Sequence, residues 1–341
     1  MKNEWIQELL SWYKEYKRDL PWRKTKNAYL IWVSEIMLQQ TRVEAVIPYY
    51  ERFIKRLPTL KDLSEIEEDE LLKLWEGLGY YSRVRNMQKC AKNVIEQGKV
   101  ELPSTYEELI KLPGIGPYTA GAIASIALGE KVPAVDGNVL RVYSRLVASF
   151  KNVSDLKVRK EIEKELSLIM PTDSGDFNQA LMELGATICI PGNPRCNICP
   201  IQKYCSGYKQ GNMWGLPIKD SKKEKKEKEY TIFLLFYQNK VAVKKRPSKG
   251  LLASLFEFPN IEGKIELDFL KEKYKNATII EGNRYKHIFT HQIWNMNSYC
   301  IHLNKKTKED YIWASLEDLA TVYTIPSAFG YFLEDIKRHI N

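Results

Sequence analysis

The chain has 341 residues, of which 44% are hydrophobic and 28% charged, a composition typical of a globular protein with room for two domains. Its formal net charge of +9 favours a polyanionic partner such as nucleic acid, although a basic surface without such a partner explains the charge equally well. No apolar run approaches the roughly 18 residues of a membrane span, and acidic residues interrupt the N-terminus, which excludes a signal peptide; we therefore expect a cytoplasmic protein.

Residues 1–214 are expected to form an all-α domain. Apolar residues recur at helical spacing in segments 4–16, 69–84 and 118–129, and proline-containing turns separate these segments. Neither an internal repeat nor a run of strands is evident in this half of the sequence.

Residues 28–42, AYLIWVSEIMLQQTR, form an apolar segment that contains one acid. Glu35 is the only carboxylate between Asp19 and Glu44. We expect a helix here, but periodicity does not decide whether Glu35 faces water or lies in the interior, where a carboxyl could do chemistry.

Two short segments follow that could contact an anion or a substrate. In LPGIGPYTA, residues 112–120, Gly114 and Gly116 expose backbone amides at the start of a helix, which favours a bound phosphate; an ordinary helix–helix corner is the alternative. Further along, Asp136 ends an apolar run and precedes a helical pattern. That position suits a helix N-cap as well as a catalytic carboxylate.

Four cysteines lie within seventeen residues, 189–205, in the pattern C-x6-C-x2-C-x5-C. Four thiolates can hold either a structural zinc ion or an iron–sulfur cluster. The long gaps on both sides of the single C-x2-C favour one 4Fe-4S cluster over zinc. The ligands would be Cys189, Cys196, Cys199 and Cys205.

The composition changes after the cysteines. Residues 215–229 are highly charged and lack an apolar face, which predicts a solvated interdomain linker, with an exposed helix as the alternative. Residues 230–341 combine segments rich in β-branched and aromatic residues with two helical patterns, which predicts an α+β domain.

Together these motifs resemble one family. SEIMLQQT, LPGIGPYTA, VDGNV and the cysteine pattern occur in this order in the helix-hairpin-helix DNA glycosylases that carry an iron–sulfur cluster, and the sequence is most similar to the MutY family of adenine DNA glycosylases. The resemblance is close from Leu20 to about Trp214 and looser beyond. It implies a helix-hairpin-helix glycosylase fold followed by a Nudix-like domain that reads 8-oxoguanine.

The resemblance also implies an activity. The enzyme would act as a monomer on double-stranded DNA containing A:8-oxoguanine or A:G, hydrolysing the N-glycosidic bond of adenine, at the nucleoid if the source is bacterial. Relatives that cleave the strand as well carry a lysine where this chain has Tyr118, and tyrosine cannot form a Schiff base, so a monofunctional enzyme is expected. An endonuclease III-like enzyme that acts on oxidised pyrimidines is the rival.

The resemblance assigns roles to individual residues. Glu35 would be the general acid at adenine N7, because burial among apolar side chains can hold its proton near neutral pH. Asp136 would stabilise or trap the sugar cation, with Asn138 and Tyr118 beside the sugar. The positions expected to contact DNA or the bases are Trp22, Arg23, Gln39, Gln40, Thr41, Tyr80, Gly114, Gly116, Gln179, Phe289, Thr290 and His291. Thr290 stands where the family has serine, which adds a methyl group to the reading loop.

Overall fold

The structure, a computed structural model, describes residues 4–221 and 224–340. The chain forms two compact units. The first comprises Met1–Glu65 and Arg85–Ser221, and the second comprises Ile66–Val84 and Lys222–Asn341. Each unit is described by itself below.

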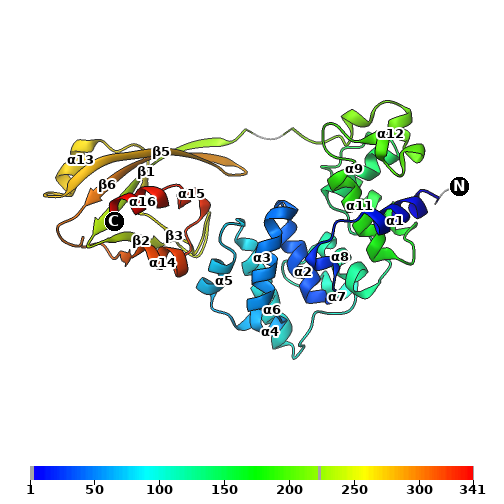
Figure 1. Cartoon of the computed structure of the whole chain (residues 1–341), viewed down its shortest axis with the longest axis horizontal. Coiled ribbons are helices and arrows are strands. Elements are labelled where there is room, and N and C mark those ends of the chain that lie inside the picture. Colours follow the sequence, from blue (N-terminus) through cyan, green and yellow to red (C-terminus); the bar gives the residue numbers. More distant parts are fainter. Residues whose placement is uncertain (1–3, 222–223, 341) are drawn as a thin grey trace. The chain divides into compact units, whose positions relative to one another are not determined.

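Helices make up the regular structure of the first unit (Figure 1). They are α1 Glu4–Tyr16, α2 Ala28–Leu38, α3 Val43–Arg56, α4 Leu60–Glu65, α6 Ser82–Glu96, α7 Tyr106–Leu109, α8 Pro117–Leu128, α9 Gly137–Leu146, α10 Leu156–Ser167, α11 Ser174–Thr187 and α12 Ser206–Lys209, with α6 beginning in the second unit. Short 3-10 turns are Pro21–Arg23, Cys196–Ile198, Gln202–Tyr204 and Met213–Gly215. The all-α prediction for this half is confirmed.

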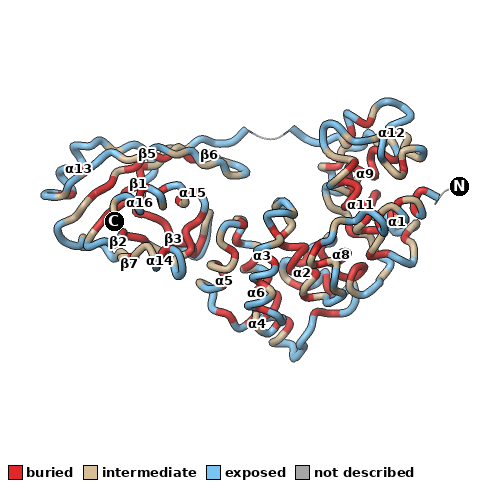
Figure 2. The backbone as a smooth tube through the Cα atoms, in the orientation of Figure 1, coloured by how far each residue is buried: buried red, intermediate tan, exposed pale blue. Residues whose placement is uncertain are grey.

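Helix α2 crosses the interior of the unit. The Asn27 side chain caps it by accepting the Leu30 amide, and its residues from Ile31 to Met37 are all buried (Figure 2). Because α2 is buried around nearly its whole circumference, its sequence carries no amphipathic signal. The helix packs chiefly against α8, which begins at the Gly116–Pro117 step.

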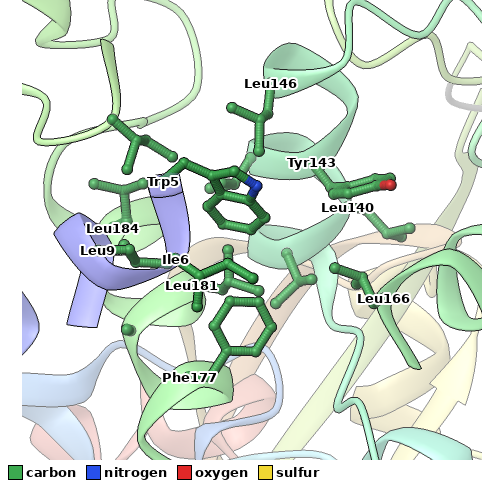
Figure 3. Close-up of a cluster of buried hydrophobic side chains, with 14 of the residues drawn as sticks. Trp5, Ile6, Leu9, Leu140, Tyr143, Leu146, Leu166, Phe177, Leu181 and Leu184 are labelled. Carbon is green, nitrogen blue, oxygen red and sulfur yellow. The ribbon is translucent and has the colours of Figure 1, made fainter. Parts of the chain in front are cut away.

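A second group of buried side chains joins α1, α9, α10 and α11 (Figure 3). Trp5 of α1 lies against Phe177 of α11 with their ring centroids 5.7 Å apart. Leu140 and Leu146 of α9 and Leu181 of α11 belong to the same cluster. This packing fixes α9 against α11, and the start of α9 carries Asp136 as its N-cap.

The second unit is built on a mixed sheet with strand order β3-β2-β1-β6-β5, to which β4 and β7 are added at β1 and β2. Strands β1 and β6 are parallel and the other pairs are antiparallel. The strands are β1 Lys226–Tyr237, β2 Lys240–Lys245, β3 Phe256–Glu257, β4 Asn260–Glu262, β5 Thr278–Ile288, β6 Gln292–His302 and β7 Ile312–Ala314. The helices are α5 Glu68–Leu74, α13 Leu267–Lys273, α14 Leu316–Thr321, α15 Ser327–Gly330 and α16 Leu333–Ile340.

Helices cover both faces of this sheet (Figure 1). Alternate residues of β1 face opposite sides: Leu234 packs with Phe329 and Phe332 of the α15–α16 region, whereas Leu235 packs with Leu270 of α13. The α+β prediction for the C-terminal domain is therefore confirmed.

The boundaries differ from the sequence expectation. Strand β1 begins at Lys226, inside the segment predicted as a linker, because Lys226 pairs with Gln292 of β6. At the other end of that segment, Ile218 pairs with Asn152 of the first unit. The linker prediction is therefore wrong for these positions. Their pairing partners lie far away in the sequence, so the local composition could not reveal the pairing. No helix in the described ranges is long and apolar enough to cross a membrane.

Candidate active site

A cavity of about 610 Å³ in the first unit contains most of the predicted site residues of that unit. The predicted residues that line it are Trp22, Arg23, Glu35, Gln39, Gln40, Thr41, Tyr118, Asp136, Asn138 and Gln179. They come from the 3-10 turn Pro21–Arg23, α2 and the turn after it, α8, α9 and α11. Segments more than 150 residues apart in the sequence therefore meet at one hollow.

Glu35 is buried in α2, with 6% of its surface exposed. Burial raises the pKa of its carboxyl to about 7, against the opposing effect of the hydrogen bond that the Tyr118 hydroxyl donates to Oε2. The nearby Asp136 carboxylate raises the pKa further, and Arg23 opposes it. Glu35 can thus hold a proton at neutral pH inside the cavity.

Asp136 is held by three hydrogen bonds at the start of α9. Its Oδ1 accepts the backbone amides of Asn138 and Val139, both at 2.8 Å, and its Oδ2 accepts the Asn138 side-chain amide at 2.8 Å. Burial raises the pKa of Asp136, while these donors favour the ionised form. Asp136 is both the N-cap that the turn chemistry suggested and a carboxylate on the cavity wall.

Asn138 connects Asp136 to the cysteine loop. Its side-chain oxygen accepts Arg141 Nη2 at 2.8 Å, and Arg141 Nε donates to the backbone carbonyl of Cys189, also at 2.8 Å. Arg145 Nη1 lies 3.4 Å from Cys189 Sγ. The orientation of Asn138 therefore depends on how residues near Cys189 are folded.

The cavity wall also carries a charged cluster, of which only Arg23 was expected from the sequence. Glu183 of α11 accepts hydrogen bonds from both Arg18 and Arg23, and all three residues line the cavity. No local signal could have revealed the contact between Arg18 and Glu183, because they are 165 residues apart. Met182, which accepts a 3.8 Å contact from the Tyr118 hydroxyl, was also missed.

The glycines of the hairpin lie outside this cavity. Gly114 has φ +81°, in the left-handed region, and an added Cβ would meet Asn86 Cβ at 3.0 Å. Gly116 is the N-cap of α8, followed by Pro117 at its first position. Their conformations fit the tight turn that the sequence predicts, and phosphate binding there stays a prediction.

The remaining predicted residues belong to the second unit. Phe289, Thr290 and His291 form the turn between β5 and β6, and the Phe289 ring lies edge-on to Trp294 at 4.8 Å. Tyr80 is 48% exposed and has a left-handed φ of 47°. Its hydroxyl lies 2.8 Å from the Thr290 hydroxyl. The structure thus brings into contact two residues that were both expected to meet DNA, Tyr80 and Thr290.

The four clustered cysteines line one small cavity between α9, the end of α11 and α12. Across residues 4–221 and 224–340, they do not converge as a set that could hold a single metal ion. A zinc ion requires its sulfurs about 2.3 Å from one centre, whereas a cubane spreads its four thiolates over a larger cage.

Known proteins are similar to this chain over nearly its full length. A curated adenine DNA glycosylase of Buchnera aphidicola subsp. Schizaphis graminum is 37% identical, over 92% of this chain and 93% of the relative. The chain belongs to the adenine DNA glycosylase family. Like the other members it is a DNA N-glycosylase of base excision repair.

Family descriptions and solved structures agree with the two units of this adenine DNA glycosylase. The HhH-GPD superfamily of base excision DNA repair proteins matches residues 33–168, and a NUDIX domain matches residues 231–335. A thermostable thymine-DNA glycosylase is 28% identical with a TM-score of 0.56, covering 60% of this chain and 95% of its own. An endonuclease III trapped covalently on DNA is 26% identical with a TM-score of 0.52, covering 60% and 94%. The helix-hairpin-helix and Nudix-like folds are confirmed.

Proposed function

We propose that the enzyme removes adenine opposite 8-oxoguanine or guanine in duplex DNA and leaves the strand intact. The observation that carries this proposal is the placement of Glu35, a buried carboxyl that shares a cavity with a second carboxylate and whose pKa burial raises to about 7. Adenine leaves poorly as an anion, so protonation of its ring makes bond cleavage feasible.

The first step is a proton transfer from Glu35 to N7 of the flipped adenine. The bond between the sugar C1′ and N9 then breaks, and its electron pair stays with the base. The sugar becomes an oxocarbenium-like cation, which the Asp136 carboxylate stabilises or traps as a covalent intermediate. Water then adds at C1′, where it displaces the Asp136 carboxylate if the covalent bond has formed, and it gives a proton to Glu35, which leaves an abasic site.

Other residues of the cavity orient these groups. Tyr118 donates a hydrogen bond to Glu35, and Asn138 donates one to Asp136, so the orientation of each carboxyl group is fixed. Trp22, Arg23 and Gln179 form the wall that would receive the base. The base can reach this wall only after leaving the helix stack. In the second unit, Tyr80 would wedge into the duplex, and the turn Phe289–His291 would read the oxidised partner base.

We assign one 4Fe-4S cluster to the four clustered cysteines. A cluster there supplies a rigid metal centre that four thiolates hold. Exposed Arg195 and Lys209 flank the cysteines, and Lys203 pairs with Glu8. This basic loop would dock on DNA phosphates. A brown protein with broad visible absorbance supports the cluster, whereas a colourless protein containing stoichiometric zinc contradicts it.

The test uses a duplex with adenine opposite 8-oxoguanine and separates base release from strand cleavage. We expect adenine release, with nicking only after alkali. The Glu35→Gln variant should bind the duplex but release no adenine. Full activity of this variant would remove Glu35 as the acid.

The rival endonuclease III-like activity has a distinct signature. It would nick the strand without alkali at the rate of base loss, and it would act on oxidised pyrimidines. Tyr118 opposes it, because a phenol cannot form the Schiff base on which such a lyase depends.

The reading role of the second unit is tested in the full-length chain. Phe289→Ala and His291→Ala should reduce the preference for 8-oxoguanine over guanine while release from A:G persists. An unchanged preference in both variants would end that assignment. We expect the enzyme to be a monomer and, if the source is bacterial, to act at the nucleoid.

A further inference from the structure

The buried carboxylate of Glu183 holds two arginines at the cavity wall. Only 2% of its side chain is exposed. Arg18 donates Nε to Oε1 at 2.8 Å and Nη2 to Oε2 at 2.9 Å, and the Arg18 backbone amide donates to Oε1 at 3.2 Å. Arg23 donates Nη2 to Oε2 at 2.7 Å. One carboxylate therefore receives four hydrogen bonds, three of them from guanidinium groups.

We propose that Glu183 is a positioning residue, which anchors the guanidinium groups of Arg18 and Arg23 and neutralises the charge that Arg23 presents to Glu35. This inference rests on the proposed role of Glu35 as the acid. It goes beyond that role because Glu183 acts through Arg23 and makes no contact with the proton that is transferred.

Glu183 is ionised whenever the enzyme works. Burial would raise the pKa of Glu183, but the hydrogen bonds from Arg18 and Arg23 outweigh burial and hold the pKa at about 2. A change of activity near neutral pH therefore reflects the titration of a group other than Glu183. It also means that the negative charge facing the arginines is constant.

Further contacts hold the two arginines. Arg23 Nη1 donates to the backbone carbonyl of Arg18 at 2.9 Å, and the Arg23 guanidinium lies 5.3 Å from the centre of the Tyr13 ring. Arg18 Nη1 also lies 3.6 Å from a carboxylate oxygen of Glu44, which is exposed on α3. Only 10% of the Arg23 side chain is exposed, so water screens its charge poorly.

Arg23 acts on Glu35 through its charge, since both side chains line the same cavity. Three titratable or charged groups influence Glu35: Tyr118 from α8, Asp136 at the start of α9, and Arg23 from the turn before α2. Arg23 is a cation, so its charge lowers the pKa of Glu35 and works against proton retention. Without the Glu183 charge, the positive charge of Arg23 would have no compensating carboxylate. It would then lower the pKa of Glu35 further, so Glu35 would lose its proton at a lower pH.

The experiment measures single-turnover adenine release from an A:8-oxoguanine duplex between pH 5 and pH 9. In the wild type the rate should fall as the pH rises through the pKa of Glu35, because only the protonated acid works. For Glu183→Gln we expect this fall to move by about one pH unit to lower pH. At pH 8 the variant should therefore release adenine about tenfold more slowly than the wild type. At pH 5.5 the loss should be much smaller.

Two further variants separate charge from structure. Arg23→Gln should move the fall in rate to higher pH, opposite to Glu183→Gln. The Glu183→Gln/Arg23→Gln double variant should return it toward the wild-type position. Glu165→Gln is the matched control, because Glu165 pairs with Tyr143 away from the cavity and its loss should leave the profile unmoved.

The outcomes are distinct. A Glu183→Gln rate that falls equally at every pH, or Glu183 and Arg23 variants that shift in the same direction, would overturn the inference. If Glu183→Gln does not fold, the direction of the Arg23→Gln shift decides alone. A wild type without the high-pH fall, or an active Glu35→Gln, would overturn the proposed acid as well.

Discussion

At the scale of single residues, the proposed mechanism depends on the protonation of Glu35. A carboxyl whose pKa rises to about 7 in the folded state binds its proton more tightly there than in the unfolded chain. Folding stability therefore contains a contribution that is fully present below the unfolded pKa of 4.5. This contribution is lost as the pH rises through about 7. The same raised pKa is what would make Glu35 a useful acid.

We expect Glu35→Gln to be more stable than the wild type at pH 8. Glutamine cannot ionise, so the variant lacks the penalty of about 3 kcal/mol that the shift in pKa implies. The advantage should shrink toward pH 4.5, where both forms are neutral. Thermal unfolding temperatures of the two proteins across this range provide the measurement. A difference independent of pH would show that Glu35 is not the group that titrates.

At the scale of elements, helix α9 carries the second carboxylate as its N-cap. The Asp136 side chain satisfies two amides that the helix itself leaves open, so a structural role and the proposed catalytic role coincide at one residue. Substitutions can separate these two roles.

We expect Asp136→Asn to retain the cap and lose activity. Asparagine is an equally good N-cap, so the variant should unfold at or above the wild-type temperature, whereas Asp136→Ala should lose about 1 kcal/mol. Both should release adenine at least about 100-fold more slowly, because neither supplies a negative charge. An Asp136→Asn variant with wild-type rates would show that only the cap matters.

The close approach of α9 and α11 makes a second prediction at this scale. A Cβ added at Gly185 would lie 2.6 Å from Asn138 Cβ, so the helices must separate. Gly185→Ala should cost about 1–3 kcal/mol and slow adenine release, since Asn138 orients Asp136.

Gly215→Ala provides the control for that substitution. Its added Cβ would meet nothing within 4 Å, and Gly215 lies outside the cavity. Both variants are compared by thermal unfolding and single-turnover release. Equal behaviour of the two variants would contradict the packing argument.

At the scale of the whole molecule, the net charge of +9 predicts salt-dependent binding to any duplex. Using Glu35→Gln to prevent turnover, we expect the Kd for undamaged DNA to rise about 10³-fold between roughly 50 and 200 mM salt. Unfolding temperatures measured over the same salt range control for stability. A Kd that does not change with salt would mean that the positive charge lies away from the DNA.

The sequence determined the folding class and much of the chemistry because those signals are local. Helical spacing identified the all-α half, strand composition identified the α+β half, and the cysteine pattern identified four residues that line one cavity. The turn chemistry around Asp136 correctly predicted an N-cap.

Only the tertiary structure decided what depends on distant partners. The burial of Glu35 comes from packing α2 on every side, a situation in which periodicity carries no directional signal. The start of β1 at Lys226 comes from pairing with Gln292, and the anchoring of Arg18 by Glu183 crosses 165 residues. Such contacts form only when the chain closes on itself, so a local pattern of residues cannot reveal them.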